Sequence, residues 1–170
     1  MLRAVVAICF AALIAVLSGE RILATRGDDG RSRLEGQASV QDGDSLRMNG
    51  ERLRLVQIDA CELGQPATRG GRRFDCGAWA RDALQEIVGS RRLRCEAEGR
   101  DQYRRVLAEC FTADGASVNL AAVRSGAVFV YDRRRAPRRF LEAEDEARDR
   151  GAGVWGFVVD RPFDYRRRQG

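Results

Sequence analysis

The sequence contains no histidine and no lysine. Without histidine, the chain cannot use a histidine general base, a histidine-containing catalytic triad or a histidine-ligated zinc site. Acid–base chemistry must therefore rely on carboxylates, tyrosine, arginine-assisted water or metal-bound water. Because lysine is absent, all 30 basic residues are arginine. A GC-rich genome accounts for this bias, but its physical consequence remains, since arginine binds phosphate as a planar fork.

Long apolar runs are also scarce, and the one clear run covers residues 4–17, after Arg3. It is shorter than the roughly 20 residues of a membrane span and has the layout of an export signal. We interpret residues 1–18 as a signal peptide or an uncleaved N-terminal anchor, and residues 19–34 as a polar linker. Either reading places the bulk of the chain outside the cytoplasm, either periplasmic or secreted, with membrane attachment through residues 4–17 in the second case.

The remaining composition is that of a globular protein with a basic surface. Of the 170 residues, 44% are apolar and 32% are charged, which suits one domain with a core. The net charge of +5 and the pI near 9.3 favour anionic partners, first of all nucleic acid or a membrane surface.

Cysteine usage agrees with an oxidising compartment. Cys9 lies in the apolar leader, which leaves Cys61, Cys76, Cys95 and Cys110. None of these four forms a CxxC pair, so the spacing favours disulfides over zinc. Four cysteines allow three connectivities.

The hydrophobic pattern predicts short strands and helices punctuated by glycine. Strands are expected on both sides of the turn at 42–44, at 52–59, at 91–98 and 104–112 as a second hairpin, and at 127–131. Helices are expected at 75–88, 117–125 and 138–150, and residues 60–73 are expected to form a loop. This order predicts an α+β fold, for which a small oligonucleotide-binding-type β-barrel with packed helices is the natural candidate; another α+β sheet remains open. The barrel domain is assigned to residues 35–156 and a basic tail to 157–170.

Residues 42–62 carry several acidic groups, with Arg54 between them, in strand-forming sequence. Asp44 and Asp59 lie at strand ends, where carboxylates can converge on a hard cation. Arg54 projects from the strand between them and suits a phosphate. Glu62 is the best candidate to orient or deprotonate water, and Arg105 in the second hairpin could complete a phosphate clamp. Taken singly, each acid is better explained as a turn residue than as a ligand.

The full set of motifs resembles the thermonuclease, or staphylococcal nuclease-like, family from about Val40 to Trp155. The matching pieces are DGDSLRMNGERLRLVQIDACE, GRDQYRRVLAEC, ADGASVNLAAVRSGAVFVY and FLEAEDEARDRGAGVWG. The resemblance implies a five-stranded oligonucleotide-binding-type barrel with three helices. It also implies calcium-dependent hydrolysis of DNA or RNA phosphodiesters that leaves 3′-phosphates.

The same resemblance assigns roles residue by residue. Asp44 and Asp59 match calcium-binding carboxylates, and the backbone carbonyl of Ala60 matches a further ligand. Glu62 matches the proposed general base, while Arg54 and Arg105 match the arginines that bind phosphate and stabilise the transition state. The remaining matches are nucleotide contacts at Tyr103 and, more loosely, Tyr131, and structural positions at Asn119, Glu144 and Trp155.

Two positions depart from the family pattern. Cys61 stands where proline is usual, and Arg104 stands where glycine is usual. On this layout Cys95 and Cys110 face each other across the second hairpin, and Cys61 then pairs with Cys76. We expect the Cys61–Cys76 bridge to fix the Glu62 loop in place of the proline.

Two other functions compete with a nuclease. A non-catalytic nucleic-acid-binding barrel of the cell envelope is the first, although such a copy is expected to lose one or more of the five polar site residues. The second is an envelope protein that binds membrane or wall polymers through Arg133–Arg135 and Arg166–Arg168, which a solvated charged face explains as well. No stable protein partner is expected, and the chain is expected to be a monomer.

Overall fold

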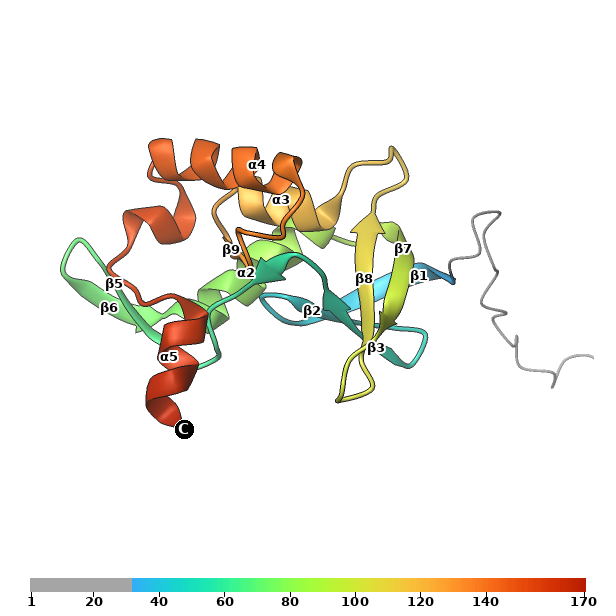
Figure 1. Ribbon diagram of the computed structural model, residues 1–170, viewed down its shortest axis with the longest axis horizontal. Helices are drawn as coiled ribbons and strands as arrows, with labels where there is room; N and C mark the ends of the chain where they lie inside the picture. The colour runs from blue at the N-terminus through green and yellow to red at the C-terminus, as the bar shows by residue number, and fades with distance from the viewer. Residues whose placement is uncertain (1–31) are drawn as a thin grey trace, which may run out of the picture.

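The computed structural model describes residues 32–170, so the predicted leader and most of the predicted linker lie outside it. The fold is built on a closed barrel with the strand order β1-β2-β3-β8-β7 (Figure 1). These strands are β1 (Arg33–Asp42), β2 (Ser45–Met48), β3 (Glu51–Leu55), β7 (Arg92–Arg100) and β8 (Val106–Phe111). Strand β1 closes the barrel because it pairs with β2 on one side and with β7 on the other. The predicted α+β barrel is confirmed.

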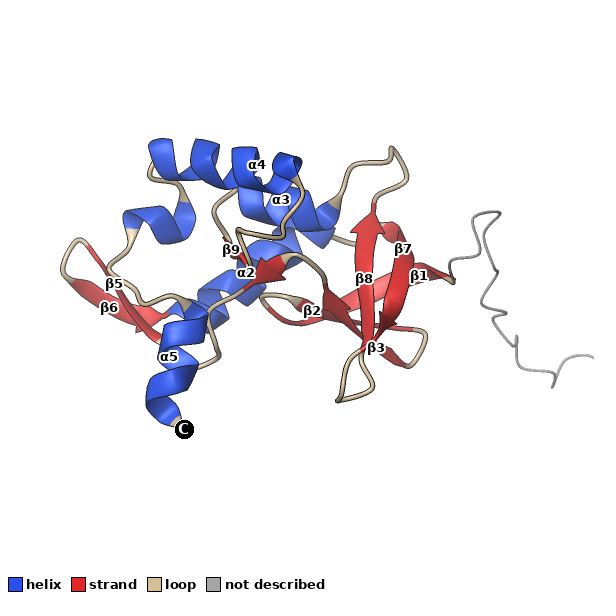
Figure 2. Ribbon diagram, in the orientation of Figure 1, coloured by secondary structure: helices blue, strands red, loops and turns tan. Residues whose placement is uncertain are grey.

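Four α-helices accompany the barrel within residues 32–170, one more than predicted. They are α2 (Cys76–Val88), α3 (Val118–Arg124), α4 (Arg138–Asp149) and α5 (Pro162–Gln169), and a 3-10 helix, η1, spans Gly153–Gly156. The helices α2, α3 and α4 gather beside the barrel, whereas α5 projects from the opposite side of this layer (Figure 2). Helix α5 lies in the predicted tail and lacks apolar periodicity. Proline at its first position and arginines in its last turn favour the helix locally.

The core joins the inner face of the barrel to the helices. Alternate strand residues point inward, and the helices add one apolar face each. Each fully buried leucine or phenylalanine contributes about 2 kcal/mol of hydrophobic transfer free energy. The buried barrel residues include Leu46, Met48, Leu53, Leu55, Leu93, Val106 and Ala108, and the helices add Leu84, Val88, Val123 and Phe140.

The predicted strand 52–59 is interrupted. Residues Ile58–Asp59 form a separate strand, β4, which pairs with β9 (Phe129–Val130) and not with the barrel. Gln57 has a φ of 69°, in the left-handed region, and this turns the chain out of the barrel. The buried Asn119 holds the turn, since its Nδ2 donates to the carbonyls of Val56 at 3.0 Å and Ala108 at 3.2 Å. The prediction of one continuous strand was therefore wrong at its second half.

Part of the predicted loop 60–73 is a hairpin. Strands β5 (Pro66–Arg69) and β6 (Arg72–Asp75) pair across Gly70 and Gly71, which both have positive φ. Thr68 also forms a bridge with Val158, so the hairpin fastens the segment that precedes α5. The sequence signal was weak because neither strand carries the alternating apolar residues that indicate a strand.

Candidate nuclease site

A cavity of about 940 Å³ lies where β3, the Glu62 loop and the β7–β8 hairpin meet. Its walls include most of the residues predicted for chemistry: Asp44, Arg54, Glu62, Tyr103, Arg105 and Tyr131. Asp59 is not a wall residue, but its carboxylate contacts two wall residues, Arg54 and Arg166. The fold thus brings together all the predicted catalytic, metal-binding and substrate-binding side chains from separate segments of the chain.

Asp44 is held at the cavity by a tightly packed turn. A Cβ on the preceding Gly43 would lie 2.5 Å from the Cβ of Ala60 and 2.8 Å from that of Ala80, so only glycine fits there. The backbone N–H of Ala60 donates to Asp44 Oδ2 at 3.1 Å, and that of Leu55 donates to the Asp44 carbonyl at 2.9 Å. These contacts fix the carboxylate relative to both β3 and β4.

Burial raises the pKa of Asp44 to about 7, from an ordinary value of 3.8. Removal from water disfavours the charged carboxylate, and the neighbouring carboxylates Asp42 and Asp59 act in the same direction. Arg54 and the Ala60 N–H oppose this shift but do not cancel it. A cation bound beside Asp44 would therefore stabilise the ionised form of its carboxylate.

This raised pKa predicts a pH-dependent stability difference between the wild type and Asp44→Asn. Between about pH 4 and pH 7 the folded protein holds the Asp44 proton and the unfolded chain does not, so the contribution of Asp44 to stability falls as pH rises through this window. Asparagine does not titrate. We expect Asp44→Asn to gain stability relative to the wild type from pH 4 to pH 8, measured by urea unfolding with chelator present. A pH-independent difference would contradict the raised pKa.

Asp59 is almost fully enclosed, with 4% of its surface exposed. It ends β4, where pairing with Phe129 of β9 fixes its backbone. Two guanidinium groups surround its carboxylate. Arg54 Nη2 lies 3.5 Å from Oδ1, and Arg166 donates from Nη1 to Oδ1 at 3.0 Å and from Nη2 to Oδ2 at 3.1 Å.

Arg54 links the two predicted metal-binding carboxylates. It leaves β3 at a half-buried position, and its Nη1 lies 2.8 Å from Asp44 Oδ2. The same nitrogen donates to the carbonyl of Leu55 at 3.1 Å. Because the guanidinium is held on several sides, it is oriented before any ligand enters the cavity.

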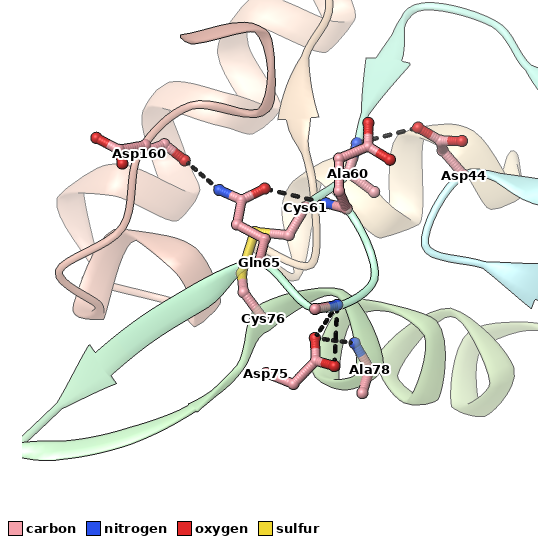
Figure 3. Close-up of a disulfide and its surroundings, with 10 residues drawn as sticks. Asp44, Ala60, Cys61, Gln65, Asp75, Cys76, Ala78 and Asp160 are labelled. Atoms are coloured by element: carbon pink, nitrogen blue, oxygen red, sulfur yellow. Dashed lines mark hydrogen bonds between the residues drawn. A yellow bond between two sulfur atoms is a disulfide. The ribbon is translucent and has the colours of Figure 1, made fainter. Parts of the chain in front are cut away.

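The Glu62 loop is fastened to the start of α2 (Figure 3). The Cys61–Cys76 disulfide joins them, with the two Cα atoms 5.6 Å apart. The N–H of Glu62 donates to the buried Gln65 side chain at 3.0 Å. A Cβ on Gly77 would lie 2.1 Å from the Glu62 carbonyl oxygen, so glycine permits the close approach of helix and loop. Both predicted disulfide pairings are present, the second joining Cys95 to Cys110 across β7 and β8.

In the β7–β8 hairpin, the side chain of Arg105 forms an ion pair with a carboxylate, that of Asp101. Arg105 Nε donates to Asp101 Oδ2 at 2.8 Å, and its backbone N–H donates to Oδ1 at 2.9 Å. The guanidinium also lies 5.7 Å from the ring centre of Tyr103. Tyr103 and Tyr131 are exposed at 61% and 63%, which leaves both rings free for stacking on a ligand.

At Arg104, one of the two departures from the family pattern, the backbone has a conformation that suits glycine. Its φ is 64°, a conformation that glycine adopts without strain and that other L-residues disfavour by roughly 1 kcal/mol. Its N–H still donates to the Asp101 carbonyl at 2.9 Å. The turn therefore keeps the geometry suited to glycine although it carries arginine.

We expect Arg104→Gly to stabilise the protein by about 0.5–1 kcal/mol, because it removes the left-handed strain and the turn is otherwise retained. Chemical denaturation measures the change. The matched control is Arg100→Gly, in extended backbone one turn away, which should destabilise because it removes an ion pair with Glu51 and adds flexibility to a strand. Destabilisation by Arg104→Gly would show that the arginine side chain has a structural role.

Two site residues were missed by the sequence. Arg166 was assigned to a basic tail, and nothing in that run of arginines distinguishes it from Arg167 or Arg168. Asp101 lies in the motif GRDQYRRVLAEC, but no role was predicted for it. The hydrogen bonds that Arg166 donates to Asp59 and Glu62 raise its pKa and keep it charged, with the Asp59 bond the larger cause. Glu62 Oε1 accepts from Arg166 Nη1 at 2.8 Å.

The oxygen atoms around the cavity suit a hard divalent cation. Asp44 and Asp59 supply carboxylates, and Ca²⁺ prefers oxygen ligands of this kind. No group of three or more Asp, Glu, Cys or His side chains able to hold a metal ion occurs within residues 32–170. A cation here would therefore need backbone or water oxygens in addition. The guanidinium of Arg166 forms an ion pair with Asp59, which indicates that this position attracts positive charge.

Comparison with known proteins agrees with the barrel. The sequence model of the family described as Staphylococcal nuclease homologue matches residues 52–156. This is the class of protein that the closed barrel and the arginine–carboxylate cavity define. The chain belongs to the staphylococcal nuclease family and carries a nuclease-type domain.

Relatives support the same assignment. The chain is 38% identical over 122 residues to the succinoglycan biosynthesis protein ExoI of Rhizobium meliloti (strain 1021), covering 71% of this chain and 63% of that protein. It is 32% identical over 120 residues to an uncharacterized endonuclease of Escherichia coli, covering 68% of this chain and 72% of the relative. Endonuclease YhcR of Bacillus subtilis (strain 168) is 27% identical over 150 residues, covering 76% of this chain but 12% of that protein.

Proposed function

We propose that this protein is an exported, calcium-dependent nuclease that hydrolyses phosphodiester bonds of DNA and/or RNA and leaves 3′-phosphates. One observation carries the proposal: Arg54 lies between two enclosed carboxylates at a cavity whose walls also present Glu62 and Arg105. The endonuclease names of several relatives point to the same substrate class.

The carboxylates of Asp44 and Asp59 and the carbonyl of Ala60 would hold Ca²⁺. When bound, the ion supplies positive charge that polarises a phosphoryl oxygen. Asp44 favours a bound cation because Arg54 and the Ala60 N–H do not fully offset the cost of burying its ionised carboxylate. The remaining chemistry belongs to the side chains of the chain itself.

The two arginines bind the phosphate and stabilise the charge that develops on it. Arg54 is already oriented by its contact with Asp44, so it loses little freedom when substrate enters. Arg105 approaches from the opposite hairpin, with Asp101 fixing its guanidinium. Glu62, with a side chain 44% exposed, accepts the proton of the attacking water. Tyr103 and Tyr131 stack on the flanking bases.

Export is supported by the leader pattern and by the two disulfides, which persist in oxidising compartments. Within residues 32–170, no helix is both long and apolar enough to cross a membrane. The domain organisation proposed is a leader or anchor at 1–18, a linker up to 34, the nuclease domain to 156 and a basic segment at 157–170.

One assay tests the proposal against its rivals. Protein lacking residues 1–21 is incubated with single-stranded DNA in the presence of calcium or chelator. Calcium-dependent cleavage that is lost in Glu62→Gln and kept in Glu86→Gln, an exposed glutamate on α2, supports a nuclease. Salt-sensitive binding without cleavage would instead favour a non-catalytic nucleic-acid-binding barrel. Absence of any interaction at moderate salt leaves the envelope-polymer function.

A further inference from the structure

Helix α5 places a guanidinium on two residues of the proposed active site. Arg166 engages both carboxylate oxygens of Asp59 and one oxygen of Glu62, at 2.8–3.1 Å. These are a proposed metal ligand and the proposed general base. The Arg166 side chain is 39% exposed, so it enters the cavity from the solvent side and is not part of the core.

The rest of α5 is weakly attached to the molecule. Pro162 is the one buried residue of this helix, and Phe163 is 56% exposed. The last three residues before Gly170 are exposed as well. Figure 1 shows α5 projecting from the body with its end in solvent. The helix has no apolar face to bury. Ion pairs of Arg166 with Asp59 and Glu62, and of the exposed Arg168 with Asp160, attach it to the domain, and the first of these involves the proposed site residues.

The segment before α5 is firmly anchored, in contrast. Val158 exchanges backbone hydrogen bonds with Thr68 at 2.8 and 3.0 Å. The buried Gln65 donates to the Asp160 carbonyl at 2.9 Å. Arg161 lies 5.0 Å from the ring centre of Phe129 and pairs with the buried Glu144. A weakly packed helix after an anchored segment can move away without disturbing the barrel.

We propose that α5 is an autoinhibitory segment in which Arg166 competes with calcium for Asp59. This inference rests on the proposed function in one respect, that Asp59 is a calcium ligand. A guanidinium that donates to both oxygens of a carboxylate competes with a metal ion for their lone pairs, and two adjacent cations repel each other. The same guanidinium also occupies Oε1 of Glu62, so that oxygen is not open to a water molecule while the pair persists.

This arrangement makes calcium the signal that opens the site. Calcium binding at Asp59 displaces Arg166, and α5 then swings outward on the 157–161 segment, which frees Glu62. The family match ends at residue 156, so α5 lies beyond the residues it covers. The barrel supplies the catalytic groups, and α5 adds a threshold of calcium concentration below which they are blocked.

Calcium titration calorimetry on protein comprising residues 22–170, without nucleic acid, tests the competition. Arg166→Ala should bind calcium about tenfold more tightly than the wild type, since the bidentate ion pair with the enclosed Asp59 no longer has to be broken. The matched control is Arg167→Ala, on the same helix with the same loss of charge but no contact to either acid. It should bind calcium within about twofold of the wild type. Arg166→Lys, which keeps the charge but lacks the fork, should lie between the two.

Hydrogen exchange of the α5 amides provides a second readout. Calcium should accelerate exchange of these amides in the wild type and leave the barrel strands protected. Equal calcium affinities of Arg166→Ala and wild type, or α5 exchange that calcium does not change, would overturn the proposal.

The outcome separates this inference from the proposed function. If Arg166→Ala binds calcium more tightly yet cleaves no nucleic acid, autoinhibition of metal binding stands and the nuclease proposal fails. If cleavage depends on calcium but Arg166→Ala binds it no better than the wild type, the nuclease stands and the autoinhibitory role of α5 fails. If neither protein binds calcium, Asp59 is not a calcium ligand, and this proposal is overturned together with the calcium dependence.

Discussion

Replacing Arg54 with alanine is expected to lower the turnover number for DNA cleavage by about a hundred- to thousandfold. Donors that are oriented before the reaction have effects of this size when they are removed, because they stabilise charge that develops in the transition state. Arg54 is such a donor, since Asp44 at 2.8 Å and the Leu55 carbonyl at 3.1 Å hold its guanidinium in place. The loss should fall on kcat more than on KM.

The control for this prediction is Arg47→Ala. Arg47 is an exposed arginine on the neighbouring strand β2, and its side chain contacts only the Gly50 carbonyl among the hydrogen bonds of the described residues. Both variants remove one positive charge from the barrel, so a general electrostatic effect would reduce both rates equally. Initial rates at saturating calcium, with circular dichroism to verify folding, measure the difference. Cleavage by Arg54→Ala at the wild-type rate would exclude Arg54 from the reaction.

Removing the Cys61–Cys76 bridge is expected to lower the free energy of unfolding by about 3 kcal/mol and, separately, to reduce the cleavage rate. A disulfide stabilises mainly by restricting the unfolded chain, and these cysteines are 15 residues apart. For a domain of this size the midpoint temperature should fall by roughly 10 °C. The rate should fall as well because Glu62 follows Cys61 directly, and a looser loop positions its carboxylate less well.

The second disulfide provides a matched control. Cys95 and Cys110 are also 15 residues apart, so the double serine variant should lose a similar amount of stability. This bridge joins β7 to β8 within the barrel and does not touch the Glu62 loop. At a temperature where both variants are fully folded, only Cys61→Ser/Cys76→Ser should show a lower kcat. Equal kcat values for the two double variants would contradict our interpretation that the Cys61–Cys76 bridge fixes the Glu62 loop in place of the usual proline.

Local patterns were sufficient for most of the barrel. Alternating apolar residues in 45–55 and 92–111 and the helical spacing in 76–88 depend on neighbours in sequence, and the strands and α2 form close to the predicted bounds. Where local preference and tertiary contact disagree, the prediction failed. The break at Gln57 accompanies the pairing of β4 with β9, and the β5–β6 hairpin is bridged to Val158, far along the chain.

For the candidate site, too, the residues could be predicted from the sequence but their contacts could not. Asp44, Arg54, Asp59, Glu62 and Arg105 could be identified because they recur at spacings that the resemblance makes specific. The ion pairs that these residues form in the folded protein could not be predicted from the sequence. The Arg105–Asp101 contact depends on the turn that Arg104 makes with positive φ, and the Arg166 contacts span more than a hundred residues of sequence.

By itself, the sequence determined the class of this protein: an oligonucleotide-binding-type barrel, cysteines suited to disulfides, and a histidine-free set of acids and arginines suited to phosphate chemistry. These properties follow from residue type and short-range periodicity. Only the tertiary structure decided which cation now occupies Asp59 and Glu62. Side chains of one charge are interchangeable in a sequence, and the path of the anchored segment at 157–161 alone brings Arg166, and neither Arg167 nor Arg168, onto these acids.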